Sequence, residues 1–237
     1  MKGITMRKFE LTASNILARR ATIIDDASHV EARLQELHPD LSIIIFRDAI
    51  QGGLGGRNEA TRASAPTAAG IQQWLKTVED LRTLLATVQW HIHEQQNCPF
   101  ISSPLRDISI VVMTGNSETG KNGFEDPTNQ AEKGAVAENF VQKNKQLELF
   151  NREAFKLAKK NKKETQVWAL LYHYDKMLKE VRFELSLPTG FDKKKITDWG
   201  ERLILGNISN NPTNFTIHKD VPNAPATVEV EPKTGTF

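Results

Sequence analysis

The sequence predicts an α+β fold: a small mixed or antiparallel sheet flanked by two long amphipathic helices, with long flexible loops and a polar C-terminal tail. In two long stretches apolar residues recur every three or four positions, which is the period of an amphipathic helix. Other apolar runs are short, and some alternate with polar residues as strands do. The helices are predicted over 70–95 and 136–160, and the strands over 41–50, 106–113, 167–175 and 180–187.

The first long helix has the strongest pattern, because apolar residues keep helical spacing over 71–88. A shorter helix is expected before it, with Asp25 or Asp26 as its N-cap and Pro39 just after its end. Near the C-terminus, apolar residues three to four apart predict a last helix over 196–206. Four helices are therefore expected in all.

The predicted strands differ in how they are buried. "LSIIIFRDAI", residues 41–50, has four consecutive apolar residues, three of them β-branched, and indicates a strand covered on both faces. In "EVRFELSLP", residues 180–188, apolar and polar residues alternate, so one face is buried and the other meets water. This strand follows "TQVWALLYHYD" after a short connection, which indicates an antiparallel hairpin.

Length and composition indicate a globular protein. The chain has 237 residues, of which 39% are hydrophobic and 25% charged, enough for a sizeable core. We expect one α+β domain over 1–206, with a subdivision near 114–135 as an alternative, and a polar, partly disordered tail over 207–237. The absence of a long apolar run and the single cysteine, Cys98, predict a cytoplasmic protein that does not enter a membrane.

One loop has the spacing of a phosphate-binding loop. In "MTGNSETGKNG", residues 113–123, Gly115 and Gly120-Lys121 follow a predicted strand, as in a nucleotide-binding motif. However, Asn122 stands where the motif has a magnesium-binding hydroxyl, and Pro127 works against the helix that should follow. We therefore expect a mobile polar loop that contacts a partner or a polyanion rather than a nucleotide-hydrolysing site.

A second glycine-rich stretch, "GGLGG" at 52–56, lacks the helix start that a dinucleotide fingerprint needs, because Ser64, Pro66 and Gly70 follow it. We expect a flexible loop of about 20 residues, a length that is usually functional, disordered or interdomain. Guanidinium groups suit phosphate and carboxylate, so the arginines around this loop could receive an anion. They are Arg47, Arg57 and Arg62.

Neither a metal centre nor a cofactor site is predicted. His91 and His93 would point about 200° apart on a helix and could not share an ion. Asp175 and Glu184 lie on adjacent predicted strands, and paired carboxylates can hold magnesium in a nuclease. The Glu-x-Lys spacing of the commonest nuclease core is missing, so ordinary cross-strand charge pairing is the favoured interpretation. No catalytic residue is assigned.

Basic residues are dense in the second half of the chain. Between residues 143 and 163 there are eight basic side chains against two acidic ones, and three further lysines follow at 193–195. Such a cluster attracts phosphates, although a helix C-terminus also favours lysines without any ligand. The predicted nucleic-acid-binding residues are Lys143, Lys145, Arg152, Lys156, Lys159, Lys160, Lys162, Lys163, Lys193, Lys194 and Lys195.

No motif identifies a family. The leading hypothesis is a non-catalytic intracellular binding or assembly protein, whose long loops and tail contact a protein partner and whose lysine-rich helix meets nucleic acid or another polyanion. The alternative is a metal-dependent nuclease or other phosphate-handling enzyme, with Asp175 and Glu184 as metal ligands and the 115–121 loop near the phosphates. No cofactor is expected for the leading hypothesis.

Overall fold

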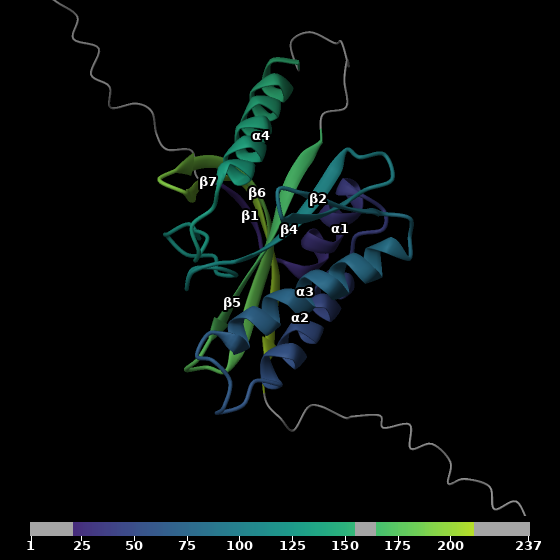
Figure 1. Ribbon diagram of the computed structural model, residues 1–237. Helices are drawn as coiled ribbons and strands as arrows, with labels where there is room; N and C mark the ends of the chain where they lie inside the picture. The colour runs from purple at the N-terminus through teal and green to yellow at the C-terminus, as the bar shows by residue number, and fades with distance from the viewer. Residues whose placement is uncertain (1–20, 155–164, 211–237) are drawn as a thin grey trace, which may run out of the picture.

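The computed structural model describes residues 21–154 and 165–210, which form a seven-stranded mixed sheet and four α-helices (Figure 1). The helices are α1 (Ala27–Leu37), α2 (Ile43–Asn58), α3 (Ala68–Ala86) and α4 (Ala135–Ala154). The strands are β1 (Thr22–Ile24), β2 (His91–Gln95), β3 (Cys98–Ser102), β4 (Ile108–Thr114), β5 (Gln166–Asp175), β6 (Glu180–Asp192) and β7 (Lys195–Ser209). The predicted architecture, a small sheet flanked by two long helices, was therefore wrong.

The strands lie in the order β1-β7-β6-β5-β4-β3-β2. β4 runs parallel to β5 and β1 parallel to β7, whereas the other neighbours are antiparallel. Because β4 and β5 are parallel, both strands end at the same edge of the sheet, at Thr114 and Asp175. The predicted β5–β6 hairpin is confirmed.

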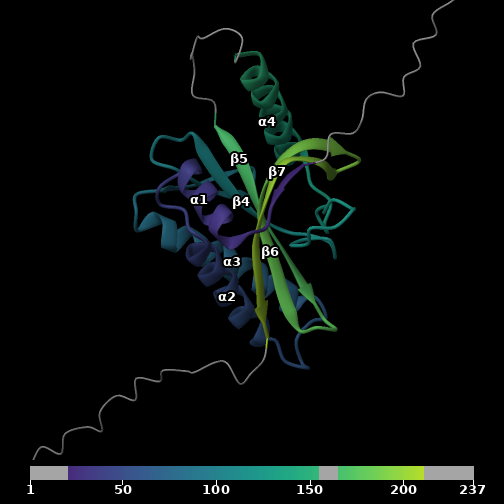
Figure 2. The same ribbon diagram turned by 180° about the vertical axis from the view of Figure 1, so that it is seen from behind.

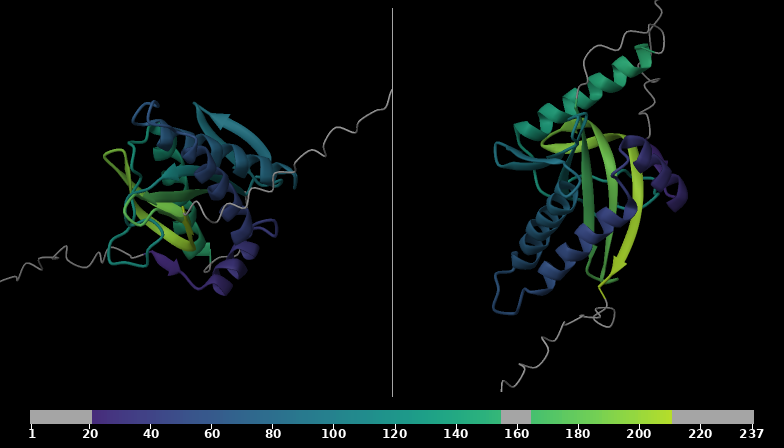
Figure 3. Two further views of the ribbon diagram at one scale, coloured as in Figure 1. Left: turned by 90° about the horizontal axis from the view of Figure 1, so that it is seen from below. Right: turned by 90° about the vertical axis from the view of Figure 1, so that its right-hand side faces the viewer.

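The two faces of the sheet are covered by different elements. On the face that we call the helix face, Trp168 and Leu170 of β5 pack with α1, α2 and α3. On the opposite loop face, Ala169 and Leu171 pack with α4, and the 115–134 segment between β4 and α4 also lies there. Figures 1 and 2 show α2 and α3 side by side near one end of the strands and α4 near the other. The right-hand view of Figure 3 shows the same separation from the side.

Residues 41–50 were predicted as a strand, but most of them belong to α2. The Ser42 hydroxyl accepts a hydrogen bond from the Ile45 N–H at 3.4 Å and caps the helix. The buried positions continue at helical spacing beyond the apolar run, through the glycines that were predicted as a flexible loop. They are Phe46, Ala49, Ile50, Gly53, Leu54 and Gly56.

The glycines of "GGLGG" allow α2 to pack closely on α3. A Cβ atom at Gly53 would overlap the Thr77 hydroxyl and come within 2.9 Å of the Gln73 carbonyl oxygen. A Cβ atom at Gly55, in contrast, would meet no heavy atom within 4 Å. The stretch is therefore neither a flexible loop nor a nucleotide-binding turn, but part of a helix–helix interface.

Residues 196–206 were predicted as a helix but form most of β7. The pairing of β6 with β7 shifts register at four points, and each bulge changes which side chains face which side of the sheet. Ile196 and Trp199 consequently pack on the loop face, whereas Leu203 and Leu205 pack on the helix face. This alternation of faces produces apolar spacings of three and four that resemble a helical period.

The other predicted helices and strands are present among the described residues, with different ends. α1 begins after Asp26, whose carboxylate accepts hydrogen bonds from the N–H groups of Ser28 and His29. α3 and α4 correspond to the two long predicted helices, although α3 ends at Ala86 and the chain turns into β2. β7 continues to Ser209, past residue 207 where the tail was expected to begin. No described helix combines the length and the apolar character needed to cross a bilayer.

The glycine interface gives a direct test of the α2–α3 packing. Gly53→Ala should lower the free energy of unfolding by about 1–3 kcal/mol, because the added methyl group must displace Thr77 and backbone. Gly55→Ala, the matched control in the same helix, should raise it by about 0.5–1 kcal/mol, since alanine restricts the unfolded chain. Urea denaturation followed by circular dichroism measures both. Equal effects of the two substitutions would contradict this packing.

Candidate functional site

A buried ion pair lies at the centre of the loop face. Glu184 of β6 and Arg202 of β7 are both fully buried, and their side chains form two hydrogen bonds, of 3.0 and 2.7 Å. The carboxylate also accepts from the Ser186 hydroxyl and from the Gly120 N–H, each at 2.8 Å. Arg202 donates further to the Lys121 carbonyl and to Asp126. The pair thus joins two strands to the loop above them.

Arg182, two residues before Glu184 on the same strand, holds the loop at two further points. It donates to the carbonyl oxygens of Ser117 and Thr119 at 3.0 and 3.2 Å. Gly120 directly follows the second of these anchors and has a φ of +72°, and a Cβ atom there would come within 2.7 Å of the Arg182 Cβ. Only glycine combines this backbone angle with this approach.

These contacts involve the segment that has the spacing of a phosphate-binding loop. In a phosphate-binding loop the backbone N–H groups point at the ligand, but the Gly120 N–H donates to Glu184 of the same chain. The Lys121 ammonium is exposed and pairs with Glu118 at 3.4 Å. The segment was predicted as a mobile loop. Within the structure it is fastened to the sheet by two arginines.

A cavity of about 770 Å³, which we call the α3 cavity, lies beyond the parallel ends of β4 and β5. Its walls are Arg57 at the end of α2, the first two turns of α3, residues 172–176, and part of the 115–134 segment from Gln130 to Lys133. With Thr114 at the end of β4, residues from five separate parts of the chain line this one space. Its volume is within the usual range of small-molecule sites.

Two deeply buried side chains in this cavity have unused hydrogen-bonding groups. Gln73 is 1% exposed and Tyr172 2% exposed. Among the described residues, neither the Gln73 Nε2 nor the Tyr172 hydroxyl has a hydrogen-bond partner. Burial raises the pKa of the Tyr172 phenol well above its usual value, so the hydroxyl keeps its proton and can donate. Other unpaired buried polar atoms occur elsewhere in the structure, but these two line the same cavity.

The cavity also contains cations that no carboxylate of the described residues neutralises. The Arg57 guanidinium donates to Gln73 Oε1 at 3.2 Å and lies 3.7 Å from the centroid of the Tyr174 ring. No described carboxylate forms an ion pair with it. Burial lowers the pKa of the Lys133 ammonium, and no described residue gives this ammonium a hydrogen bond or an ion pair. The arrangement therefore favours a negatively charged guest.

The acidic groups near the cavity are already paired within the protein. The Asp175 carboxylate interacts with Arg182 at 3.2 Å and accepts hydrogen bonds from the N–H groups of Met177 and Leu178. Asp175 and Glu184, the ligands of the nuclease hypothesis, are not brought together: Asp175 lies opposite Glu180, and Glu184 lies opposite Leu171. Among the described residues, no three His, Cys, Asp or Glu side chains lie close enough together to hold a metal ion.

The two histidines considered as ligands lie on β2 rather than on a helix, so the argument that they point apart does not apply. Residues two apart on a strand share a face. His93 stacks on Phe100 with ring centroids 5.3 Å apart, and both histidines are exposed. They are part of the exposed edge strand, without a third ligand beside them in the described chain.

The predicted nucleic-acid-binding residues are distributed over several places. Lys143 and Lys145 are exposed on α4. Arg152 belongs to the same helix, but its side chain lies outside the described residues, as do all the lysines between 156 and 163. Lys193 and Lys194 are exposed in the β6–β7 turn, where Lys194 pairs with Glu132, whereas Lys195 donates to the Asn129 and Gln130 carbonyls.

Comparison with protein-family models, with curated proteins and with solved structures gives no match, so the function has to be argued from the residues themselves. Of the three arginines that were considered for an anion, Arg57 lines the α3 cavity, whereas Arg47 and Arg62 do not. Gln73 and Lys133 were missed. Both lie outside any local motif and become neighbours only in the folded chain.

The buried ion pair predicts a particular pattern of stabilities. Arg202→Met should lower the free energy of unfolding by about 3–5 kcal/mol, because it leaves the Glu184 carboxylate buried and without its cation. The double substitution Glu184→Gln, Arg202→Met removes that charge and keeps an acceptor for the Gly120 N–H, so it should be less destabilising. Chemical denaturation measures both. A double variant as unstable as Arg202→Met would show that the charge is not the cause.

Proposed function

We propose that this protein is a non-catalytic binding protein and that it binds a small anionic molecule in the α3 cavity. The observation that carries the proposal is a pair of donors without a partner in the part of the chain that the structure describes, the Tyr172 hydroxyl and the Gln73 Nε2, in side chains that are at least 98% buried. Leaving a buried donor unsatisfied costs about 1–3 kcal/mol. A ligand that accepts from both groups would recover this cost.

Charge supports an anion rather than a neutral ligand. Arg57 and Lys133 line the cavity without carboxylate partners among the described residues, and the nearby Asp175 is already paired with Arg182. A cation over an aromatic ring, such as Arg57 over Tyr174, is also held in a fixed place and can orient a ligand. The proposal places no chemical reaction at this site.

A protein partner and a cytoplasmic location are part of the same proposal. Every residue of the edge strand β2 is exposed, and an uncovered edge strand offers backbone groups to another chain. Cys98, the single cysteine of the sequence, is a free thiol, which suits a reducing compartment. Both features support the proposal without specifying the partner.

The two tyrosines of the chain provide a test of the ligand site. Tyr172→Phe removes a hydroxyl without a partner, so the free protein should keep its stability or gain about 1 kcal/mol, while anion affinity falls about tenfold. Tyr174→Phe is the matched control, because the Tyr174 hydroxyl accepts from Asn210. It should not lower anion affinity as much. Thermal denaturation and calorimetric titration with small phosphates and carboxylates measure the two effects.

Two results would count against the ligand site. One is that no small anion binds to the unsubstituted protein at low salt. The other is that Tyr172→Phe destabilises the free protein as much as a typical buried Tyr→Phe change that breaks a hydrogen bond. The hydroxyl would then have a structural partner, and the central observation would no longer hold.

A second candidate function is contact with nucleic acid or another polyanion through α4. The observation in its favour is a separate cavity of about 450 Å³ that Lys143 of α4 lines together with Arg106, which precedes β4. Neither side chain forms an ion pair with a described carboxylate. Two unpaired cations from different elements on one exposed surface give a phosphate backbone more than one contact.

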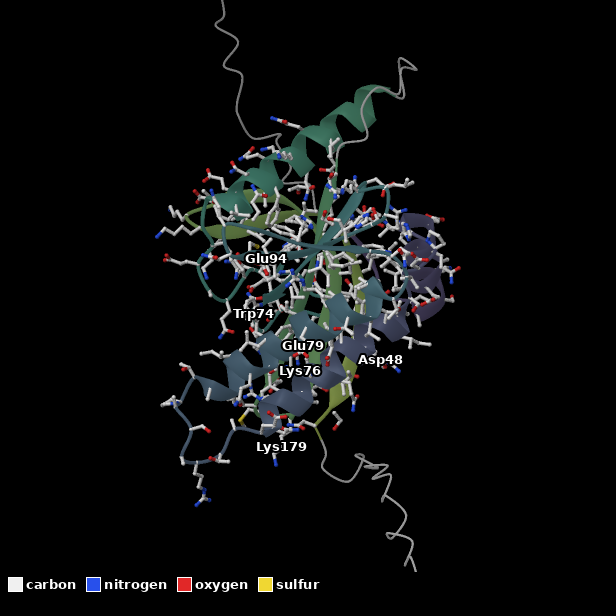
Figure 4. The ribbon with its side chains drawn as sticks, turned by 45° about the vertical axis from the view of Figure 1, so that its right-hand side comes forward. Asp48, Trp74, Lys76, Glu79, Glu94 and Lys179 are labelled. Atoms are coloured by element: carbon white, nitrogen blue, oxygen red, sulfur yellow. The ribbon has the colours of Figure 1, made fainter. Side chains whose placement is uncertain are left out.

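This candidate predicts a loss of polyanion binding with a weaker salt dependence. Lys143→Gln combined with Lys145→Gln should reduce affinity for labelled single-stranded RNA or DNA. The negative slope of log K against log salt should become smaller in magnitude by about 0.7 to 0.9 for each lost contact. Lys179→Gln is the control, since this lysine is exposed in the β5–β6 turn at the opposite end of the molecule from α4 (Figure 4). Fluorescence anisotropy at several salt concentrations measures the slope. Equal slopes for all three proteins would exclude this surface.

A further inference from the structure

The charge of the α3 cavity indicates what kind of anion fits it. Two cations of the cavity wall, Arg57 and Lys133, have no neutralising partner in the described chain, and a further lysine, Lys176, is exposed at the rim. A carboxylate ligand would bring one negative charge and leave one of them uncompensated. A phosphate monoester carries about −1.5 to −2 charges near pH 7, because its second pKa is about 6. Its charge therefore matches the cavity.

The number of donors leads to the same class of ligand. The Tyr172 hydroxyl, the Gln73 Nε2 and the Arg57 guanidinium lie in the cavity wall, and the first turn of α3 forms another part of it. Thr67, the N-cap residue of this 19-residue helix, makes no side-chain capping bond. A Cβ atom at Gly70 would meet nothing within 4 Å, so the helix terminus is open to a guest. Helix N-termini attract anions, and three phosphate oxygens use more of these donors than two carboxylate oxygens do.

A second cavity, of about 300 Å³, adjoins the first and shares Trp74 and Lys133 with it. It lies where β3 and β4 diverge: these strands pair only at Ile101 with Ile110 and at Ser102 with Ser109. Its lining includes apolar residues of both strands and of the start of α4, such as Pro99, Met113 and Ala137. We call it the β3–β4 cavity.

Trp74 lines both cavities. It comes from α3 and is labelled in Figure 4. Its indole N–H donates to the Val112 carbonyl oxygen at 3.2 Å, on the part of β4 that β3 does not cover. This hydrogen bond fixes the plane of the indole ring, which gives a preorganised aromatic surface for a planar group.

We propose that the α3 cavity binds the phosphate of a phosphate monoester whose ring-bearing body lies against Trp74 and extends toward the β3–β4 cavity. A nucleoside monophosphate has this chemistry. The inference rests on the proposed anion-binding function and adds the ligand class to it. Arg57, Tyr172 and Gln73 bind the phosphate, Lys133 balances its second charge, and Trp74 contacts the ring.

The test uses the full chain and adenosine 5′-monophosphate as the probe, with adenosine, inorganic phosphate and benzoate as partial ligands. Calorimetry at pH 7.5 and low salt should give an affinity for the monophosphate at least about tenfold above that for each partial ligand. Between pH 7.5 and pH 5 the affinity should fall about tenfold, as the phosphate takes up its second proton near pH 6. Benzoate stays singly charged over this range, so it is the control for any effect of pH on the protein's own groups in the cavity wall, which include His173, Asp175 and Lys133. Its affinity should fall less than that of the monophosphate.

Variants of two lysines on the same cavity separate a charge effect from a general one. Lys133→Gln should weaken monophosphate binding about tenfold and should not destabilise the protein, because no described residue pairs with this ammonium. Lys176→Gln, an exposed lysine on the cavity rim, should have less than a threefold effect. Trp74→Leu should reduce the advantage of the monophosphate over inorganic phosphate, and circular dichroism checks that each variant is folded.

The possible results distinguish the two proposals. Benzoate binding as tightly as the monophosphate, without a pH effect, would overturn the phosphate assignment and leave the anion-binding function standing. Inorganic phosphate binding as tightly as the monophosphate would overturn the role of Trp74 and of the second cavity. Absence of binding by every anion would overturn both proposals.

Discussion

The buried Glu184–Arg202 ion pair is the interaction on which the rest of the loop face depends. Two charges taken out of water are stabilising only when hydrogen bonds satisfy their remaining oxygen and nitrogen atoms. Here Ser186 and the Gly120 N–H satisfy the carboxylate, and Asp126 and the Lys121 carbonyl satisfy the guanidinium. The ion pair therefore needs the loop for its hydrogen bonds, and the loop is held in place by the ion pair. If either the loop or the ion pair is displaced, a charged group remains in the apolar interior without its hydrogen-bond partners.

The anchored 115–134 segment in turn builds one wall of the α3 cavity. The Gln130 N–H donates to the Thr114 carbonyl at 2.8 Å, and the Lys133 N–H donates to the Lys194 carbonyl at 3.0 Å. Lys195 donates to the carbonyls of Asn129 and Gln130. Lys194 and Lys195, two of the residues predicted to bind nucleic acid, thus also hold the backbone that places Lys133. Residues of a basic cluster can therefore stabilise the fold, and the contacts of each residue show whether it does.

Much of the secondary structure could be predicted, and the errors have identifiable physical causes. The period of α3, the cap at Asp26 and the β5–β6 alternation are local signals, and each was sufficient. Residues 41–50 were misread because a short apolar run does not distinguish a buried helix from a strand, and because the glycines at 52–56 act through contacts with α3. β7 was misread because bulges change the face of its side chains.

The candidate site was predictable only in part, for a different reason. Arg57 was noticed because guanidinium groups suit anions, but the site also needs Gln73 from α3, Lys133 from the segment before α4, and Tyr172 from β5. No spacing in the sequence relates these four residues, since the α2–α3 packing and the parallel pairing of β4 with β5 bring them together. Folding energy alone does not favour leaving two buried donors unpaired in such a place. A bound ligand would explain the arrangement, because it would accept hydrogen bonds from both donors and recover the free energy that leaving them unpaired costs.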